Sequence, residues 1–229
     1  MDVHDGLRQR IIEAAAALLD EGGREALTTR SVASAAGTQA PNIYRLFGDK
    51  DGLLDAVAEH GFTRYLADKL ARTPKSDPVE DMRHGWDLHV AFGLSNPALF
   101  SLMYGEPRPG NASPAVLSAR AGLLTHIRAI AAAGRLKVSE ERAAEMIQVG
   151  GCGTVFVLLS MPEHERDCSL SVAAREAVLA AITTDVHVLA DHRAPVAASA
   201  LRSELAEVDV LSDAERRLLD EWLRRIASD

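Results

Sequence analysis

A cluster between residues 39 and 45 offers the chemistry of base recognition. Gln39 and Asn42 each carry an amide, which can pair with adenine through two hydrogen bonds. Between them, Ala40 and Pro41 offer small apolar surfaces that can touch a thymine methyl group. The cluster therefore predicts contact with the edges of DNA bases, without indicating which base sequence it reads.

Two short helices joined by a tight turn are expected to position this cluster. Thr28 is a good N-cap for the first, because its side-chain oxygen can accept from an orphan backbone N–H. Gly37 can end that helix in the left-handed conformation, and Pro41 fits the first turn of the second. Asp49 can cap a further helix that begins at Lys50. This pattern is typical of a helix-turn-helix, whose second helix enters the major groove.

The stretch resembles the DNA-binding domain of the TetR family of bacterial transcriptional regulators. The matching residues, at fixed spacing, are Thr28, Arg30, Ala33, Ala36, Gly37, Tyr44, Phe47, Lys50, Leu53 and Leu54. With the helix before them, the resemblance covers about residues 5–65, and the rest of the chain matches only in helical architecture and length. The resemblance implies that Tyr44 and Lys50 contact the DNA backbone, Lys50 from a helix N-terminus that itself favours a phosphate.

Further phosphate contacts are expected where the first of the two short helices begins. Backbone N–H groups point outward there, and simple capping is the alternative role for these residues. The whole predicted DNA-binding set is Thr28, Thr29, Arg30, Gln39, Ala40, Pro41, Asn42, Tyr44, Arg45 and Lys50. The family often has a small hydroxyl residue where this chain has Gln39, so Thr38 is an alternative cap for the second helix.

The overall charge of −8 is unusual for a protein that binds DNA. The conflict is smaller between Thr28 and Lys50, where the charged residues are Arg30, Arg45 and Lys50 against Asp49 alone. An acidic chain can bind DNA when its contact surface is basic, and we expect few phosphate contacts and a shallow salt dependence.

Composition predicts an all-α fold. The chain is rich in Ala, Leu, Glu and Arg, and only 4% of its 229 residues are aromatic. We expect a three-helix helix-turn-helix domain over residues 1–60, then a larger helical ligand-binding and dimerisation domain over 61–229. We identify no apolar run long enough to span a membrane and no secretory signal, which favours a cytoplasmic protein with two reduced cysteines.

Caps and apolar periodicity predict the remaining helices. We expect them over residues 6–20, 50–72, from 78, from 97, 114–133, 140–161, 171–191 and from 213. The buried face of the first is expected to hold Leu7, Ile11, Ala14 and Leu18. The last is expected to cover the ligand pocket or the dimer interface with Leu219, Trp222 and Leu223.

Large soft side chains gather in the C-terminal part, where the TetR family encloses a small-molecule pocket. Aromatic and methionine side chains with a few polar tips suit an apolar or aromatic ligand. The predicted lining is Met82, Trp86, His89, Phe92, Phe100, Met103, Tyr104, Met146 and Phe156. Ordinary core packing is the alternative for each. Trp86, His89 and Tyr104 stand out, because each brings a polar atom that needs a partner when buried.

A glycine-rich stretch lies at residues 150–153, inside an apolar helix. A phosphate loop would follow a strand, so close approach of two helices is the favoured interpretation. The family dimerises through its last two long helices, which implies that the eighth and ninth helices form a four-helix bundle across a two-fold axis. Gly150, Gly153 and Leu158 are expected in that interface.

These observations predict a DNA-binding regulator. The resemblance to the TetR family implies a repressor that a small ligand releases from a near-palindromic operator. We expect no catalytic residues, metal or cofactor, since His164 and Cys168 alone are too few to hold a metal. An enzyme with a helix-turn-helix attached finds no support in the sequence. The acidic surface keeps open a helical dimer that acts through a protein partner.

Overall fold

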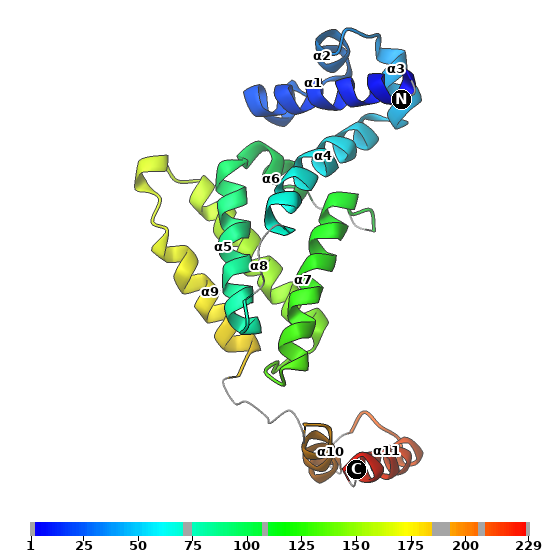
Figure 1. The fold of residues 1–229 in the computed structure, drawn as a ribbon, viewed down its shortest axis with the longest axis vertical. Coiled ribbons are helices and arrows are strands. Elements are labelled where there is room, and N and C mark those ends of the chain that lie inside the picture. Colours follow the sequence, from blue (N-terminus) through cyan, green and yellow to red (C-terminus); the bar gives the residue numbers. More distant parts are fainter. Residues whose placement is uncertain (1–2, 71–74, 107–109, 185–192, 206–208, 228–229) are drawn as a thin grey trace.

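The computed structural model describes residues 3–70, 75–106, 110–184, 193–205 and 209–227 (Figure 1). Its helices are α1 (Val3–Ala26), α2 (Thr29–Ala35), α3 (Ala40–Phe47), α4 (Lys50–Leu70), α5 (Pro78–Ser95), α6 (Pro97–Tyr104), α7 (Pro114–Ala132), α8 (Glu140–Leu159), α9 (Ser169–Ile182), α10 (Arg193–Glu204) and α11 (Asp213–Ala227), with a 3-10 turn at Glu163–Glu165. Within the described ranges there is no strand, only an isolated bridge between Leu136 and Thr183. The all-α prediction is confirmed.

Helices α1, α2 and α3 form a head at one end of the molecule (Figure 1). On α1, Ile11, Ala15 and Leu19 are buried at a spacing of four residues. This buried face is rotated from the predicted one, of which only Ile11 is fully buried. The other three residues of the predicted face are only partly buried: Leu7, Ala14 and Leu18. All four predicted residues therefore contact the core, but the centre of the buried face lies along Ile11, Ala15 and Leu19.

Helix α1 also runs past its predicted end near Asp20. It continues to Ala26, interrupted at Gly23, whose φ of 65° lies in the left-handed region. Gly23 therefore interrupts the helix, as expected for a glycine in this conformation. A further helical turn follows, and the next residue, Leu27, is buried in the core.

The body is a bundle in which α8 packs against α5, α7 and α9. By length and apolar composition, α8 is the one described helix that could cross a membrane, which differs from our expectation that no run is long enough. Its packing against three helices accounts for its apolar character, because a helix that is apolar on several sides must be buried on several sides.

Head and body share one contiguous core. Buried side chains extend without a break from Ile11 in α1 to Ile182 in α9. Helix α4 runs continuously from the head into the body, and α1 also contacts α6. An ion pair between Arg24 and Glu106 reinforces that second contact. The head is therefore attached at two places.

The C-terminal part differs most from expectation. Described α9 ends at Ile182, and the last residues of its predicted range, 185–191, lie outside the described residues. Helix α10 was not predicted. It pairs with α11 into a hairpin that lies apart from the body in Figure 1 and buries Ala198, Leu205 and Leu223. The expectation that α11 covers the ligand pocket is wrong within this chain, where Trp222 is 52% exposed.

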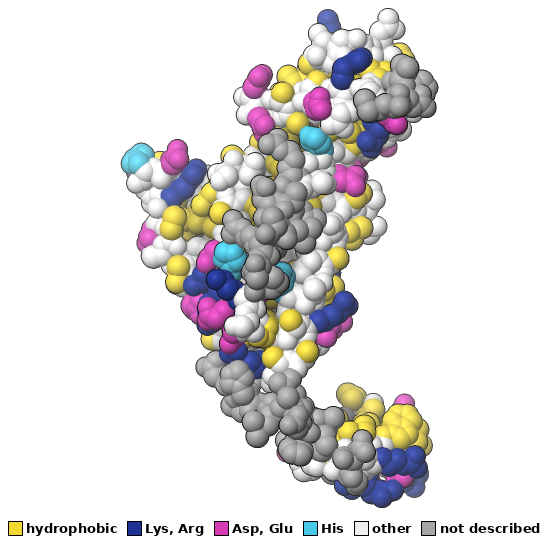
Figure 2. Space-filling model, in the orientation of Figure 1, with side chains coloured by type: hydrophobic (Ala, Val, Ile, Leu, Met, Phe, Trp, Pro, Cys, Tyr) yellow, Lys and Arg dark blue, Asp and Glu magenta, His cyan; other side chains and the backbone are white. Residues whose placement is uncertain are grey.

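Hydrophobic side chains gather on one side of this hairpin, as Figure 2 shows. The exposed ones on its helices are Leu201, Leu218, Trp222 and Ile226. On α11 they repeat every four residues, which is one face of a helix. The hairpin thus buries one apolar face within itself and leaves a second exposed.

A partly buried ion pair joins the start of α5 to the segment between α7 and α8. Asp77 caps α5 by accepting from the backbone N–H groups of Val79 (2.7 Å) and Glu80 (3.2 Å). It also binds Arg135 through both carboxylate oxygens, at 3.0 and 2.8 Å. The Arg135 side chain is only 6% exposed and also donates to the Thr184 carbonyl. Removing the charge of Asp77 would therefore take away a carboxylate that compensates this buried guanidinium.

Asp77→Asn keeps a capping side chain and removes only the charge, so it isolates the ion pair. We expect it to lower the free energy of unfolding by about 2 kcal/mol at pH 7, less than a fully buried pair because Asp77 is partly exposed. Burial disfavours the charged form of Asp77, but its backbone hydrogen bonds and Arg135 outweigh this and lower its pKa from 3.8. The charge therefore stabilises the fold above about pH 4 and loses that effect as the pH falls through the lowered pKa.

Urea unfolding of wild type and Asp77→Asn from pH 7 to pH 3 tests this expectation. The difference in unfolding free energy should stay constant down to about pH 4 and shrink below it. A difference that is absent at pH 7, or that grows in acid, would contradict the assignment.

Candidate nucleic-acid interface and ligand pocket

The start of α2 is fixed by a reciprocal capping box. Thr28 Oγ1 accepts from the Ser31 backbone N–H at 3.0 Å, and Ser31 Oγ accepts from the Thr28 backbone N–H at 3.1 Å. The predicted cap is confirmed. Thr28 and Arg30 are exposed beside it and Thr29 is half-buried, so this end of α2 is accessible to a ligand.

Helix α3 begins at Ala40, with Gln39 at its N-cap position. The Gln39 side chain makes no capping hydrogen bond and is exposed. The alternative cap, Thr38, instead accepts from the Asn42 side-chain amide at 3.0 Å. The exposed Gln39 amide is therefore accessible from solvent at the start of α3.

The outer side of α3 carries the other predicted contact residues. Tyr44 is 50% exposed and Arg45 and Pro41 are exposed, while Ile43 is fully buried beneath them. Arg45 donates to the Asn42 side-chain oxygen at 3.3 Å. The polar side chains of this helix are therefore held together on its solvent side.

Lys50 is exposed at the first position of α4, as predicted. Asp49 caps the same helix by accepting from the Gly52 N–H at 2.8 Å. Because this carboxylate already occupies the helix N-terminus, Lys50 supplies the positive charge for any phosphate there. At the same junction of α3 and α4, the Arg8 guanidinium lies 5.3 Å from the ring centre of Phe47, three residues before Lys50, and adds a further cation.

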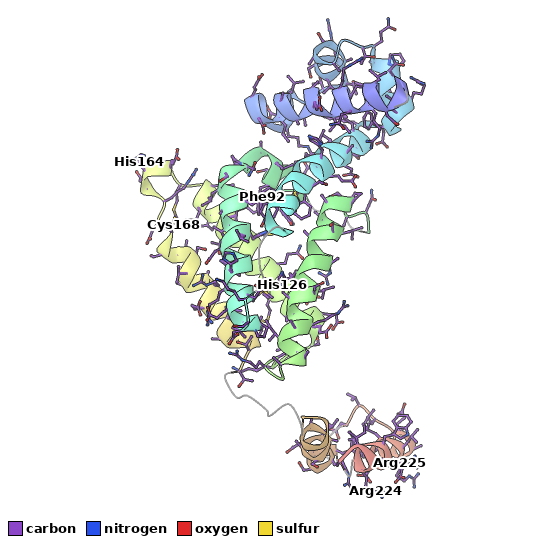
Figure 3. All side chains as sticks on the ribbon, in the orientation of Figure 1. Phe92, His126, His164, Cys168, Arg224 and Arg225 are labelled. Atoms are coloured by element: carbon purple, nitrogen blue, oxygen red, sulfur yellow. The ribbon has the colours of Figure 1, made fainter. Side chains whose placement is uncertain are left out.

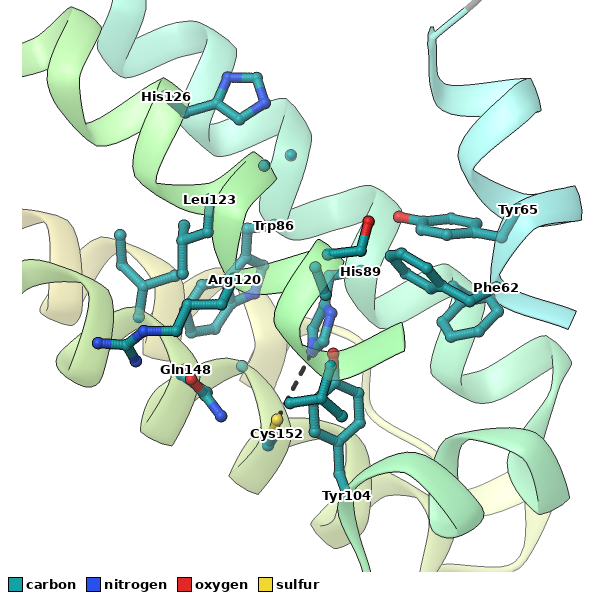
Figure 4. A pocket seen from close by; sticks show the side chains of 18 of the residues that line it. Phe62, Tyr65, Trp86, His89, Tyr104, Arg120, Leu123, His126, Gln148 and Cys152 are labelled. Carbon is teal, nitrogen blue, oxygen red and sulfur yellow. Dashed lines mark hydrogen bonds between the residues drawn. The ribbon is translucent and has the colours of Figure 1, made fainter. Parts of the chain in front are cut away.

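A cavity with an open volume of about 100 Å³ lies among α4, α5, α7 and α8 (Figure 4). Five of the residues predicted to line it do so: Met82, Trp86, His89, Phe92 and Tyr104. The other four lie outside the lining: Phe100, Met103, Met146 and Phe156. Phe100 is fully buried behind it, 5.3 Å from the Phe156 ring, so this part of the prediction describes core packing.

The prediction from sequence did not include the cavity-lining residues of α4 and α7. Phe62 and Tyr65 enter the lining from α4, and Ala119, Leu123 and His126 from α7. The signal was present, because these α7 positions follow a three-to-four-residue spacing that marks one helix face. Three further polar residues of the lining were also missed: Ser118, Arg120 and Gln148.

Polar atoms in the lining differ in whether they are already satisfied. Trp86 Nε1 donates to Ser171 Oγ at 3.1 Å, and His126 Nδ1 pairs with Asp81 at 2.9 Å. Burial raises the pKa of the Cys152 thiol to about 12, so it is protonated at neutral pH and lies 3.9 Å from His89 Nε2. Burial also raises the pKa of Tyr104, so its hydroxyl remains a donor.

A second, wider hollow of about 570 Å³ lies between head and body. Residues of α1, α4, α5 and α6 line it, among them Asp20, His60 and Asn96. Tyr65 and Phe92 line both hollows, with ring centres 4.3 Å apart. These two rings therefore form a wall between the cavity and the cleft.

An apolar stripe is exposed on the outer face of α8. Val149 is 75% exposed and Val157 is 45% exposed, with Gly153 between them at a spacing of four residues. Of the residues expected in a dimer interface, Gly153 lies on this face, whereas Leu158 is fully buried within the chain. Gly150 also packs inside the chain, because a Cβ at this position would lie 2.9 Å from the Trp86 side chain.

The described residues contain no group of three His, Cys, Asp or Glu side chains that could hold a metal. His164 and Cys168 lie on the connection between α8 and α9, at the edge of the body (Figure 3). His164 is close to Glu165, at 3.4 Å, and Cys168 is exposed.

Comparison with known proteins agrees with this architecture. Residues 11–57 match the family model of bacterial regulatory proteins of the tetR family. Over 70 residues, 31% of this chain, the sequence is 40% identical to the class C tetracycline repressor protein of Escherichia coli, and the match covers 31% of that protein. The chain spans about a third to a half of the length of the first curated relatives it matches.

Solved structures share the fold over most of the chain. SmeT, the repressor of the Stenotrophomonas maltophilia multidrug efflux pump SmeDEF, superposes with a TM-score of 0.55 at 20% identity, over 80% of this chain and 95% of SmeT. A TetR variant of Acinetobacter baumannii in complex with minocycline gives a TM-score of 0.55 at 21% identity, over 79% and 96% of the two chains. The head therefore matches the tetR family of bacterial regulatory proteins in sequence over residues 11–57, and the chain as a whole shares the fold of these solved structures.

Proposed function

We propose that this protein is a homodimeric transcriptional repressor that leaves a near-palindromic operator when a small apolar or aromatic ligand binds. Residues 1–60 would bind DNA, and residues 61–229 would bind the ligand and form the dimer. The protein would act on DNA in the cytoplasm, without catalysis or a cofactor. The observation that carries the proposal is the exposed face of α3, where Gln39, Tyr44 and Arg45 present polar groups above a fully buried Ile43.

The arrangement of charge around α3 supports DNA as the partner. Arg30 and Lys50 are exposed at the starts of α2 and α4, on either side of the turn and α3. Phosphate contacts from such positions fix a recognition helix in the groove, while amides such as that of Gln39 read base edges.

The exposed stripe of Val149, Gly153 and Val157 supports a dimer through α8 and α9. Val172 on α9 is also 49% exposed, which extends the apolar surface to the neighbouring helix. A monomer rarely leaves such a stripe in water. A two-fold pair would set the two α3 helices at successive major grooves, about 34–36 Å apart.

The wall formed by Tyr65 and Phe92 supports release by a ligand. Tyr65 belongs to α4, the helix that enters the head, and its ring faces the cavity. If the position of this wall is coupled to the orientation of the head, a ligand that favours one wall position also favours one head orientation. Such unequal affinity for two states is required of any ligand that shifts the equilibrium between them. The repressor SmeT and the minocycline-bound TetR variant have the same fold, which is consistent with this mechanism.

The test is fluorescence anisotropy with DNA taken from beside the protein's own gene. We expect tight binding that unrelated competitor DNA does not remove. Tyr44→Ala and Lys50→Ala should each weaken it by about 10- to 100-fold, the loss of one hydrogen bond to a charged group. Arg128→Ala, which removes an equal charge from an exposed site on α7, should leave the affinity unchanged.

If wild type and the three variants instead all bind this DNA equally, weakly and in a salt-sensitive way, the DNA beside the gene does not contain the operator. A selection from random DNA would then follow. If no sequence were enriched over the Tyr44→Ala control, DNA recognition would be rejected in favour of a helical dimer with a protein partner.

A further inference from the structure

We propose that the cavity takes a small aromatic carboxylate, whose acid group pairs with Arg120. This rests on the proposed function, because it names the chemical class of the ligand that would release the DNA. Some polar groups of the lining already have hydrogen-bond partners, and those that remain carry a net positive charge at Arg120.

Arg120 differs from the other arginines that the body partly buries. It lies on α7, half-buried in the cavity lining, and within the described ranges it has no ion pair or hydrogen bond. Each of the others has a carboxylate or carbonyl partner: Arg83 with Glu176, Arg135 with Asp77, Arg166 with the Leu158 carbonyl and Arg175 with Asp87. A partly desolvated guanidinium without a partner fits a planar anion, which it can bind through two parallel hydrogen bonds.

No carboxylate opposes an anion among the described lining residues. None of them is Asp or Glu. Asp81 lies behind His126, where one oxygen accepts from the Lys75 backbone N–H and the other pairs with the imidazole. A ligand anion would therefore meet Arg120 without repulsion from these side chains, whereas a ligand cation would find no carboxylate among them.

The remaining polar groups suit the same ligand. The Gln148 amide has no hydrogen bond within the described part of the chain and can donate to a second carboxylate oxygen. In Figure 4, Arg120 and Gln148 lie at one end of the lining and the rings of Phe62 and Tyr65 at the other. This order separates an end for the acid group from an end for an apolar body.

The apolar end favours an aromatic ring of modest size. The Trp86 N–H already donates a hydrogen bond to Ser171, so only the indole ring is available to a ligand. Phe62, Phe92 and Tyr65 add further rings, which pack well against an aromatic body. An open volume of about 100 Å³ is on the scale of a single ring, since cavities of about 150 Å³ bind benzene.

Isothermal titration calorimetry with matched probes tests the proposal. The probes are benzoate, phenylacetate and trans-cinnamate, each compared with its primary amide, and benzylamine as the cation. We expect at least one acid to bind at least about ten-fold more tightly than its amide. Arg120→Gln should remove this preference by weakening the acid and not the amide. Arg128→Gln, on the same helix but exposed, should keep it.

Three results would overturn the proposal: an amide that binds as well as its acid, an acid preference that survives in Arg120→Gln, or no heat from any acid at millimolar concentration. The thermal midpoint of Arg120→Gln should match that of wild type, and phenylacetamide binding serves as a second check on folding. DNA binding of wild type without ligand is measured separately. Its loss would reject the proposed function, whereas its presence with no acid binding would reject only the ligand class.

Discussion

Replacing Phe100 with alanine is expected to lower the free energy of unfolding by about 3–5 kcal/mol. The side chain is completely buried on α6. Its ring centre lies 4.8 Å from that of Tyr104, 5.3 Å from that of His89 and 5.3 Å from that of Phe156. Alanine would remove these contacts at once and leave a cavity that the surrounding helices can only partly close.

Phe100→Leu and Leu117→Ala are the controls for this loss, measured by urea unfolding. Phe100→Leu keeps most of the apolar volume and should cost clearly less than alanine. Leu117 is 56% exposed on α7, so its replacement should change stability by no more than about 0.5 kcal/mol. A loss below about 1 kcal/mol for Phe100→Ala would mean that this aromatic cluster is not packed as described.

Replacing Gly52 with alanine is expected to disrupt the junction between α3 and α4. A Cβ at this position would lie 2.1 Å from the Phe47 carbonyl oxygen, far inside contact distance. That oxygen belongs to the backbone of α3, so the clash cannot be relieved by turning a side chain. We expect a loss of about 1–3 kcal/mol in stability, and a displaced α3 should lose several DNA contacts together, at least about 100-fold in affinity.

Gly6→Ala is the matched control for that variant. Gly6 lies on α1, and a Cβ there would meet no atom within 4 Å. Alanine should therefore stabilise the helix by up to about 1 kcal/mol and leave DNA affinity unchanged. Anisotropy and circular dichroism of both variants give the comparison. Normal operator affinity in Gly52→Ala would show that the junction tolerates the methyl group.

Local chemistry made the starts of several helices predictable. Thr28 with Ser31, Asp49 with Gly52, and Ser212 with Glu215 are contacts between residues three apart, so the sequence contains all the information they need. The helix-turn-helix was predictable for the same reason. Its short helices and turn are specified by caps, a glycine and a proline within a few residues.

Contacts between distant residues were not predictable. The spacing of residues on α8 suits Gly150 and Leu158 equally well to a dimer interface and to the core of the chain. The structure shows that Gly150 faces the core, because it packs against Trp86. Arg120 was missed because its importance lies in the absence of a partner among the described residues, which no local pattern reports. Helix α10 was missed because it is weakly amphipathic and pairs with α11 rather than with the body.

The wall of Tyr65 and Phe92 bears on how a cavity of about 100 Å³ can admit a ligand larger than itself. A close-packed interior resists expansion, because every atom that moves displaces another. Here two rings have open space behind them as well as in front, in the form of the 570 Å³ cleft beneath the head. Volume can therefore be exchanged between the two hollows by moving the wall, with little compression of the core. If a ligand binds as proposed and moves this wall, the space that it gains would be taken from the cleft. The same displacement would then enlarge the cavity and narrow the gap beneath the head.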